Sequence, residues 1–420
     1  MRPLPPLPEW VALEHQVANI LTQQELHGWY FDEQGARELE STLRRELEDT
    51  IEILRRQFPF VAGALFTPKR DNRTQGYVKG CELQRLKEFN PSSRDHIAWI
   101  LQTHCNWTPT LLTASEKAVI DETVLKDIGT DISLRFLKVL ELTKALGMIS
   151  EGVNAWQKLV TTSSRIHHHC AVGCATHRCS HRNPNLAQVP SDERFRRLFL
   201  PTPGMVMVGA DLSGIELRML AHYLARYDGG KYADILLNGD IHQENADKIG
   251  ISRREVKTVT YAFLYGAGDK KIGTSFDGSL GEDQAKRKGK EIRAAYVDAI
   301  EGLSDLLEAV KRAAERGYVR ALDGRHLNVD KGHVALNYLL EGSAGVIAKR
   351  WMVLANENLR ETTYQLAFVH DELQYEAEEK DVKDLMFNLE HSAVRAGEYY
   401  NLRLPIAAES KSGVNWAEVH

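Results

Sequence analysis

The sequence predicts an α+β fold, and three observations support this prediction. Apolar residues recur at three- and four-residue spacing through residues 10–56, which is typical of amphipathic helices. The segment MVMVGADLSG is a short apolar run that reaches Asp211 just before a helical pattern begins, so we expect a strand that leads into a helix. Residues 364–379 carry two apolar stretches around a His-Asp-Glu sequence, which predicts a strand hairpin with acids near its bend.

The remaining elements follow from the same spacing rules. Residues 57–93 break the helical pattern, and the sequence TPKRDNRTQGY within them predicts a polar loop. A helix starts again in NPSSRDHIAWILQ, where Ser92 or Ser93 can cap its first turn. Helical periodicity continues through residues 131–149, and a last helix is expected at roughly 380–399.

Composition places the chain among ordinary globular proteins. It has 420 residues, of which 43% are hydrophobic and 26% charged, enough for one multi-lobed unit or two to three domains. No apolar run is long enough to span a bilayer and the start has no signal-peptide pattern, so no membrane association is expected. Five cysteines do not indicate a disulfide framework, and a reducing cytoplasm is the expected location.

The net charge of −5 argues at first against a nucleic-acid partner. Local patches rather than the average set the field that a partner meets. RFRR at 194–197 and KRKGK at 286–290 are such basic patches, so nucleic-acid binding stays open.

Four carboxylates stand out because apolar sequence surrounds them. Asp211 and Glu216 lie in GADLSGIELR, and Asp371 and Glu372 lie in VHDEL. Burying an acid costs free energy unless a cation or a hydrogen-bond donor compensates. Two such acids brought together would hold hard divalent ions, and a two-metal site serves in-line displacement at phosphorus. The alternative is that each acid caps a turn or pairs with a local arginine.

A second pattern is a stripe of cations and phenols. Arg253, Lys257, Tyr261 and Tyr265 recur every fourth residue, so they share one face of a helix. The cations suit phosphate, and the phenols offer a surface on which a base or sugar can stack. A nucleoside triphosphate has the same order of parts. The alternative is a solvated basic turn followed by a half-buried aromatic face.

These segments resemble the motifs of family A DNA polymerases, and among them most closely the replicative enzymes of short-tailed T-odd bacteriophages. DLSGIELR and VHDE match the two palm motifs, RREVKTVTYAFLYG matches the fingers motif, and NPNLAQVP at 183–190 matches the template–primer motif. The resemblance extends in consistent order over nearly the whole chain. It implies a right-hand fold in which the palm has an antiparallel sheet and the fingers and thumb are helical. The expected boundaries are a helical lead-in at 1–29, a thumb at 30–150, a palm at 151–225 and 331–420, and fingers at 226–330.

The resemblance also implies a role for each matching residue. Asp211 and Asp371 would bind two Mg²⁺ ions, and the catalytic acid Glu372 would lie beside them in support. For the nucleotide, it implies that Arg253, Lys257 and His242 hold the triphosphate, Tyr261 contacts sugar and base, Tyr265 guards the templating position, and Glu216 excludes a ribose 2′-hydroxyl. It implies contacts to primer or template from Arg178, Asn185, Gln188, Arg325, Asn337 and His370.

The function implied by the resemblance is template-directed addition of deoxynucleotides to a primer 3′-hydroxyl, in viral DNA replication within a host cytoplasm. A repair or lesion-bypass polymerase, a single-subunit RNA polymerase and a catalytically degenerate primer–template-binding protein are the alternatives. Glu216 argues against the RNA polymerase, and the intact acids and cations argue against the degenerate protein. Implied partners are primed DNA and deoxynucleotides, with a helicase–primase, a single-strand-binding protein or a separate exonuclease chain.

Departures from the phage pattern add four expectations. No set of N-terminal acids for a proofreading exonuclease is found, so no proofreading is expected in this chain. Residues 57–90 are too short for the thumb insertion that recruits thioredoxin in those relatives, so no thioredoxin dependence is expected. Glu341 replaces the usual glutamine at the primer–template minor groove and, as a carboxylate, cannot donate a hydrogen bond. Tyr261, where relatives have Phe or Tyr, is expected to favour acceptance of dideoxynucleotides.

A further feature is a short segment rich in histidine and cysteine. IHHHCAVGCATHRCSH, at 166–181, packs five histidines and three cysteines into sixteen residues. These are ligands that zinc uses, but no CxxC pair is present. We therefore favour a solvated histidine-rich loop near the duplex over a structural zinc site.

Overall fold

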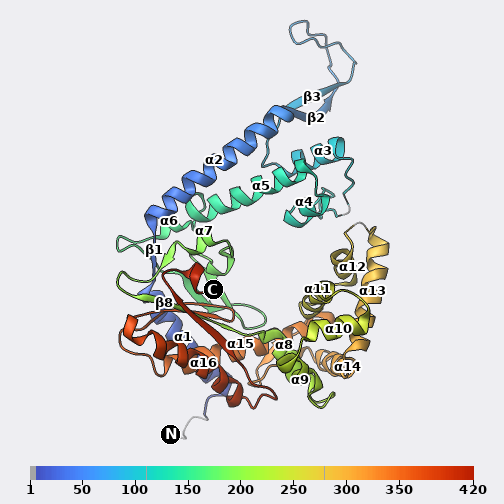
Figure 1. The fold of residues 1–420 in the computed structure, drawn as a ribbon. Coiled ribbons are helices and arrows are strands. Elements are labelled where there is room, and N and C mark those ends of the chain that lie inside the picture. Colours follow the sequence, from blue (N-terminus) through green and yellow to red (C-terminus); the bar gives the residue numbers. More distant parts are fainter. Residues whose placement is uncertain (1–5, 110, 279) are drawn as a thin grey trace, which may run out of the picture. The chain divides into compact units, whose positions relative to one another are not determined.

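The computed structural model describes residues 6–109, 111–278 and 280–420, and it divides into two compact units (Figure 1). One unit combines the residues up to Glu33 with Leu159–His420, and the other is formed by Gln34–Lys158. Among the described residues no helix is both long and apolar enough to cross a membrane.

The first unit is organised by a four-stranded antiparallel sheet. Its strand order is β11 (Tyr364–Val369), β12 (Glu372–Ala377), β8 (Val206–Leu212) and β13 (Ala408–Gly413). The strand at β8 and the hairpin of β11 and β12 are the predicted ones, which confirms both predictions. Gly209 of β8 leaves no room for a side chain, because a Cβ there would collide with the Val419 carbonyl and the Gln374 amide.

Three helices pack around this sheet. α16 (Val382–Tyr399), the predicted last helix, lies against β8 and β13, and α1 (Glu9–His27) lies against β11. α15 (Ala335–Asn356) packs between α1 and α16 and is buried along most of its length. Its central run, GSAGVIA, is small enough to let neighbouring segments approach the helix backbone closely.

The predicted helical region 10–56 is two helices with a short strand between them. α1 ends at Gly28, whose φ of +70° suits glycine, and β1 (Trp29–Phe31) precedes α2 (Glu33–Gln57). β1 pairs with β4 (Arg165–Ile166) and β7 (Phe199–Leu200) in a small antiparallel sheet.

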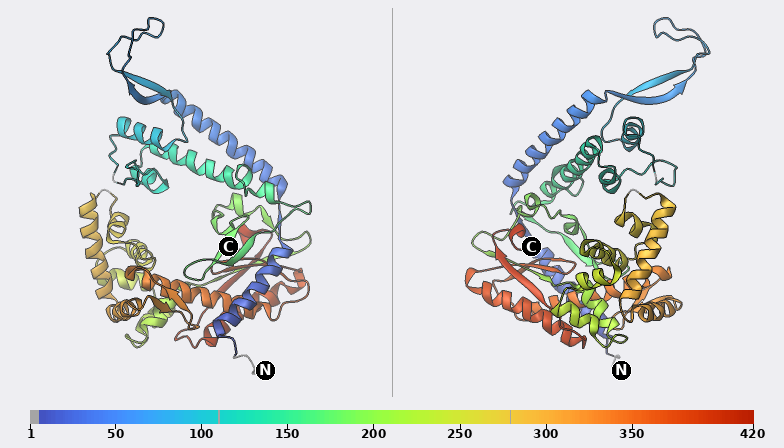
Figure 2. Two further views of the ribbon diagram at one scale, coloured as in Figure 1. Left: turned by 180° about the vertical axis from the view of Figure 1, so that it is seen from behind. Right: turned by 45° about the vertical axis from the view of Figure 1, so that its right-hand side comes forward.

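A helical subregion follows β8 in the first unit (Figure 2). α11 (Arg253–Leu264) starts at a capping box, in which Ser252 and Glu255 satisfy each other's backbone N–H groups. The other elements of this subregion are α8 (Ile215–Leu224), α9 (Lys231–Asn238), α10 (Ile241–Ile249), α12 (Asp269–Phe276), α13 (Glu282–Ala299), α14 (Leu303–Ala314), β9 (Tyr318–Arg320) and β10 (His326–Asn328).

The second unit has its own core, built from α2, α3 (Arg94–His104), α4 (Glu122–Ile128) and α5 (Asp131–Leu146). Ser93 caps α3, as predicted. The helical pattern breaks over 57–93 as predicted, and the polar loop predicted at 67–77 connects β2 (Phe60–Phe66) with β3 (Leu83–Glu88), an antiparallel hairpin that was not predicted from the sequence. Most of its side chains are exposed, so no buried face imposed an apolar alternation on the sequence.

Candidate active site

The sheet brings three of the predicted acids together. Asp211 near the end of β8 is the direct cross-strand partner of Glu372 at the start of β12. Asp371 lies in the turn that precedes Glu372, and its carbonyl accepts a hydrogen bond from the Leu212 N–H at 3.0 Å. Glu409 of β13 is the partner of Asp211 on its other side, so acids line up across three strands.

The electrostatics of this acidic row show mutual repulsion. Asp211 keeps an exposed edge, but the surrounding protein removes much of its water. This desolvation, together with the charges of Asp371 and Glu372, raises the pKa of Asp211 to about 7. Burial and the charge of Glu216 raise the pKa of Asp371 to about 6, although Arg178 opposes that shift. A bound cation would relieve this repulsion.

Glu372 has a different environment from the two aspartates. It is buried, and its Oε1 accepts hydrogen bonds from the Trp416 indole and the Gln374 amide, both at 2.5 Å. Its Oε2 lies 3.0 Å from His420 Nδ1. Burial alone would raise the pKa of Glu372, but these hydrogen bonds and the nearby histidine lower it below its usual value. Glu372 is therefore held ionised by the protein itself.

The stripe predicted on one helix lies on α11 and just beyond it. Arg253 and Lys257 are exposed, and the rings of Tyr261 and Tyr265 lie nearly parallel with centroids 6.4 Å apart. The His242 ring from α10 lies 6.2 Å from Tyr261. Arg253 is not a free cation here, because its Nε donates to Asp240 at 2.7 Å. The stripe thus presents cations at one end and stacked phenols at the other.

Glu216 connects the template–primer segment with α11. From the first turn of α8, its Oε1 lies 3.2 Å from an Arg178 guanidinium nitrogen and accepts from the Tyr265 hydroxyl at 3.4 Å. The Glu216 and Arg178 side chains are only 16% and 17% exposed. This carboxylate also contributes to the raised pKa values of Tyr261 and Asp371.

The predicted DNA contacts divide into accessible and internal residues. Asn185, Gln188 and His370 are exposed, and His370 adopts a φ of +60° in the turn before Asp371. Asn337 is half-buried, and its amide donates to the Leu264 carbonyl at 3.0 Å.

Arg325 departs from its predicted role. Its side chain is 2% exposed, and its guanidinium pairs with Asp323 at 2.6 Å and with Glu14 of α1. A guanidinium enclosed by two carboxylates has no surface left for a phosphate or a base. The sequence could not indicate this, because Glu14 lies 311 residues away along the chain.

The histidine- and cysteine-rich segment is not a solvated loop. It forms a hairpin of β5 (His169–Val172) and β6 (Cys179–Arg182), in which His168, Cys170, Cys179 and His181 are buried. Burial lowers the pKa of His168 to about 3 and that of His181 to about 4. Within the described part of the chain, no group of three or more histidine, cysteine or acidic side chains is arranged to hold a metal ion.

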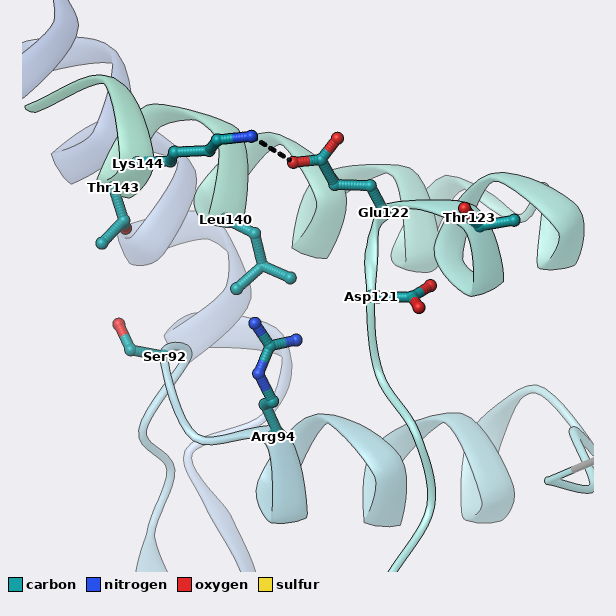
Figure 3. Close-up of a pocket in the computed structure, with 8 residues that line it drawn as sticks. All are labelled: Ser92, Arg94, Asp121, Glu122, Thr123, Leu140, Thr143 and Lys144. Carbon is teal, nitrogen blue, oxygen red and sulfur yellow. Dashed lines mark hydrogen bonds and ion pairs between the residues drawn. The ribbon is translucent and has the colours of Figure 1, made fainter. Parts of the chain in front are cut away.

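A separate cavity lies in the second unit and is not lined by these acids. Its volume is about 530 Å³. Figure 3 shows it between α3, α4 and α5, with Lys144 and Glu122 paired at 3.3 Å and Arg94 directed toward Leu140. Both charge signs line it, so it does not single out one class of ligand.

Comparison with known proteins identifies the family. The model of DNA polymerase family A matches residues 70–418. The chain belongs to this family. It is 30% identical over 500 residues to the DNA-directed DNA polymerases of Enterobacteria phage T3 and Escherichia phage T7, covering 98% of this chain and 70% of each relative.

A solved structure supports the same fold. The polymerase domain of Pol1 from M. smegmatis, in complex with DNA primer–template and dNTP, matches with a TM-score of 0.79 at 22% identity. The match covers 96% of this chain and 70% of that one. The α+β polymerase fold expected from the sequence is therefore confirmed.

Family A membership implies dependence on a divalent metal, and the acidic row of this polymerase fits one. Asp211 and Asp371 supply carboxylate oxygens, and burial together with the neighbouring carboxylates raises the pKa of both groups, an effect that a bound cation would offset. Mg²⁺ is usually bound by one or two carboxylates plus substrate phosphates rather than by an all-protein cage. Two acids are thus a sufficient protein contribution.

Several residues at this site escaped sequence reasoning. Asp240 holds Arg253, and Glu409 extends the acidic row. Trp416 and His420 bind both oxygens of Glu372 from the C-terminal segment. None of them has a local pattern that marks it, because each acquires its role from a partner distant in sequence.

Proposed function

We propose that this chain is a DNA-directed DNA polymerase that extends a primer 3′-hydroxyl with deoxynucleotides, and that it serves viral DNA replication in a host cytoplasm. The observation that carries the proposal is the assembly of Asp211 and Asp371 beside Glu216 and the α11 stripe in one unit. The 30% identity to two phage polymerases favours replication over repair or lesion bypass.

In this proposal Asp211 and Asp371 hold two Mg²⁺ ions. Bound there, the ions would supply charge stabilisation at the attacking and leaving oxygens of the displacement. Glu372 keeps its charge and, through its contacts with Trp416 and His420, connects the C-terminal segment to β12 beside Asp211.

The incoming nucleotide would lie along α11. Arg253, Lys257 and His242 would meet the triphosphate, and Tyr261 would meet the sugar and base. Arg253 would exchange its exposed contact with Asp240 for phosphate oxygens, which bind a guanidinium in a bidentate manner. Tyr265, stacked near Tyr261, would guard the templating position.

Glu216 would stand where a ribose 2′-hydroxyl would have to fit. The contacts from Arg178 and Tyr265 hold its carboxylate in a single position, which a steric barrier requires. Product and template would meet the exposed residues Asn185, Gln188 and His370, together with Arg178 and the Asn337–Glu341 pair.

The unit Gln34–Lys158 overlaps the range expected for the thumb, 30–150, and in this proposal it would act as the thumb and hold the duplex. The remaining expected boundaries keep the status of proposals: the lead-in at 1–29, the palm at 151–225 and 331–420, and the fingers at 226–330. A helicase–primase, a single-strand-binding protein and a separate exonuclease chain are the proposed partners. Independence from thioredoxin and the lack of proofreading by this chain stay predictions.

Extension of a labelled primer on a DNA template tests the proposal. Deoxynucleotides and ribonucleotides are offered separately with Mg²⁺, beside an Asp211→Ala variant. We expect extension with deoxynucleotides only, and a loss of roughly 10²- to 10⁴-fold in the variant, because metal stabilisation provides several kcal/mol. Extension with ribonucleotides alone would indicate an RNA polymerase. Tight primer–template binding without any extension would indicate a binding protein.

A further inference from the structure

Glu14 of the N-terminal helix α1 is the anion of a buried charge cluster. Its Oε1 accepts a hydrogen bond from Lys349 Nζ at 2.7 Å and another from Arg325. Lys349 and Arg325 are 1% and 2% exposed, so neither cation can turn to solvent instead. Buried charges keep their position only while they are paired. The carboxylate of Glu14 therefore fixes Lys349, and it shares Arg325 with Asp323.

Lys349 uses the same ammonium group to hold a strained backbone. It donates to the His177 carbonyl at 2.7 Å, and Arg325 Nη1 lies 3.5 Å from the His177 ring. His177 has a φ of +60°, in the left-handed region that a residue with a side chain rarely adopts. Such a conformation persists when its surroundings fix it, and it is common beside functional sites.

The loop that contains His177 is also seated against α15. A Cβ at Gly345 would lie 3.4 Å from Arg178 Cγ, and one at Gly342 would lie 3.3 Å from the Thr176 carbonyl. The loop thus packs against α15 on one side, and the Lys349 ammonium group donates to its His177 carbonyl. A shift of His177 would be transmitted directly to the next residue, Arg178.

Arg178 connects the position of His177 with the proposed nucleotide site. Its guanidinium lies 3.2 Å from Glu216, and the same Glu216 oxygen accepts from the Tyr265 hydroxyl. Four contacts in sequence therefore connect α1 with the carboxylate assigned to sugar exclusion: Glu14 to Lys349, Lys349 to His177, Arg178 to Glu216, and Glu216 to Tyr265.

We propose that Glu14 is a positioning residue for sugar selection. It fixes Lys349, Lys349 fixes the His177 carbonyl, and Arg178 then holds Glu216 at the position that excludes a ribose. This inference rests on the proposed role of Glu216, but it adds a determinant from a helix outside all the motifs that carry the nucleotide site. Loss of the Glu14 charge should loosen sugar selection more than it slows incorporation of deoxynucleotides.

The test compares Glu14→Gln with Glu9→Gln. Glu9 lies on the same helix and pairs with Arg350 of α15 and with Tyr400, so the control removes a similar ion pair that has no contact with His177. The readout is the ratio of kcat/KM for a deoxynucleotide to that for the matching ribonucleotide. We expect Glu14→Gln to lower this ratio roughly 3- to 30-fold, and Glu9→Gln to leave it unchanged.

A double-mutant cycle tests whether the effect of Glu14→Gln on this ratio depends on Arg178. In an Arg178→Ala background, Glu14→Gln should lower the ratio no further, because the connection is already broken. If Glu14→Gln does not fold, Lys349→Met decides the question, because it removes the donor to His177 and leaves Glu14 paired with Arg325. An unchanged ratio in the folded variant overturns the inference, as does an equal loss of selectivity in Glu9→Gln.

Failure of the proposed function would look different. A wild-type protein that does not extend a primer contradicts the polymerase proposal, and one that extends it without sugar selection contradicts the role of Glu216. A selective wild-type enzyme whose selectivity survives Glu14→Gln contradicts only the inference about Glu14.

Discussion

Asp211 and Glu372 are direct cross-strand partners on β8 and β12, yet they have opposite electrostatic environments. Glu372 has donors on both oxygens and a lowered pKa. Asp211 has a pKa raised to about 7 by desolvation and by the acids beside it. The two acids therefore have different roles. Glu372 stabilises the fold through its hydrogen bonds, whereas Asp211 stays available to bind a ligand.

The contribution of Asp211 and Asp371 to the stability of the metal-free protein should fall as pH rises. Asp211 and Asp371 have pKa values of about 7 and about 6 in the folded state and ordinary values near 4 when unfolded. At these two groups the folded state binds more protons than the unfolded state between about pH 4 and about pH 7, so they lower the free energy of unfolding across that window. The buried His168 and His181, whose pKa values burial lowers, act in the opposite direction. Thermal unfolding of the wild type and of Asp211→Asn with a chelator, at about pH 5 and about pH 7.5, isolates the contribution of Asp211.

Asp211→Asn is the matched control for that measurement, because it keeps the size of the side chain and removes its charge. From about pH 5 to about pH 7.5 its Tm should rise relative to that of the wild type. Mg²⁺ should raise the wild-type Tm at the higher pH, since a ligand that binds the folded state stabilises it. Parallel pH profiles of the two proteins would show that Asp211 has an ordinary pKa.

Removing the Glu216 side chain should admit ribonucleotides. Glu216→Ala opens space beside Tyr265 and should reduce discrimination against ribonucleotides roughly 10- to 200-fold, the range seen for pocket contacts of this size. Steady-state kinetics with matched deoxy- and ribonucleotides measures the ratio. Glu244→Ala, which removes an exposed ion pair with Lys248 on α10, is the control and should leave the ratio unchanged.

Tyr261→Phe should restore discrimination against dideoxynucleotides. In the proposed pose the Tyr261 hydroxyl replaces a contact that a missing 3′-hydroxyl would make, and its removal should cost dideoxynucleotides roughly ten- to a hundredfold in kcat/KM. Incorporation of the normal deoxynucleotide should change little, because its own hydroxyl makes that contact. Equal incorporation of both nucleotides before and after the change would refute the assignment.

Arg325→Ala should act on stability rather than on DNA binding. The change leaves the buried Asp323 carboxylate without its cation, whereas Glu14 keeps its contact with Lys349. Breaking a buried pair in this way costs roughly 3–5 kcal/mol. Denaturant unfolding measures this loss. Arg320→Ala on β9 is exposed and should cost within about 0.5 kcal/mol. A stable Arg325→Ala variant with weakened primer–template binding would reinstate the sequence-based prediction.

The chemistry-bearing residues could be predicted because their signals are local. A strand that ends in an acid, a hairpin with acids at its bend and a four-residue stripe each reflect the period of one element. Asp211, Asp371 and the α11 stripe were found this way, and resemblance to a known family added their roles. The β2–β3 hairpin was missed because its exposed strands bury no face, and burial is what imposes a readable alternation.

Which side chains pair with one another was decided by the tertiary structure. Arg325 looks in sequence like any other arginine near DNA-binding motifs, yet Glu14 and Asp323 enclose it. Glu372 owes its charge state to Trp416 and His420, and Glu216 owes its fixed position to Arg178 and Tyr265. Backbone periodicity encodes which side chains share a face of one element. Desolvation and ion pairing depend on which faces meet after the chain has packed, so sequence spacing alone carries no record of them.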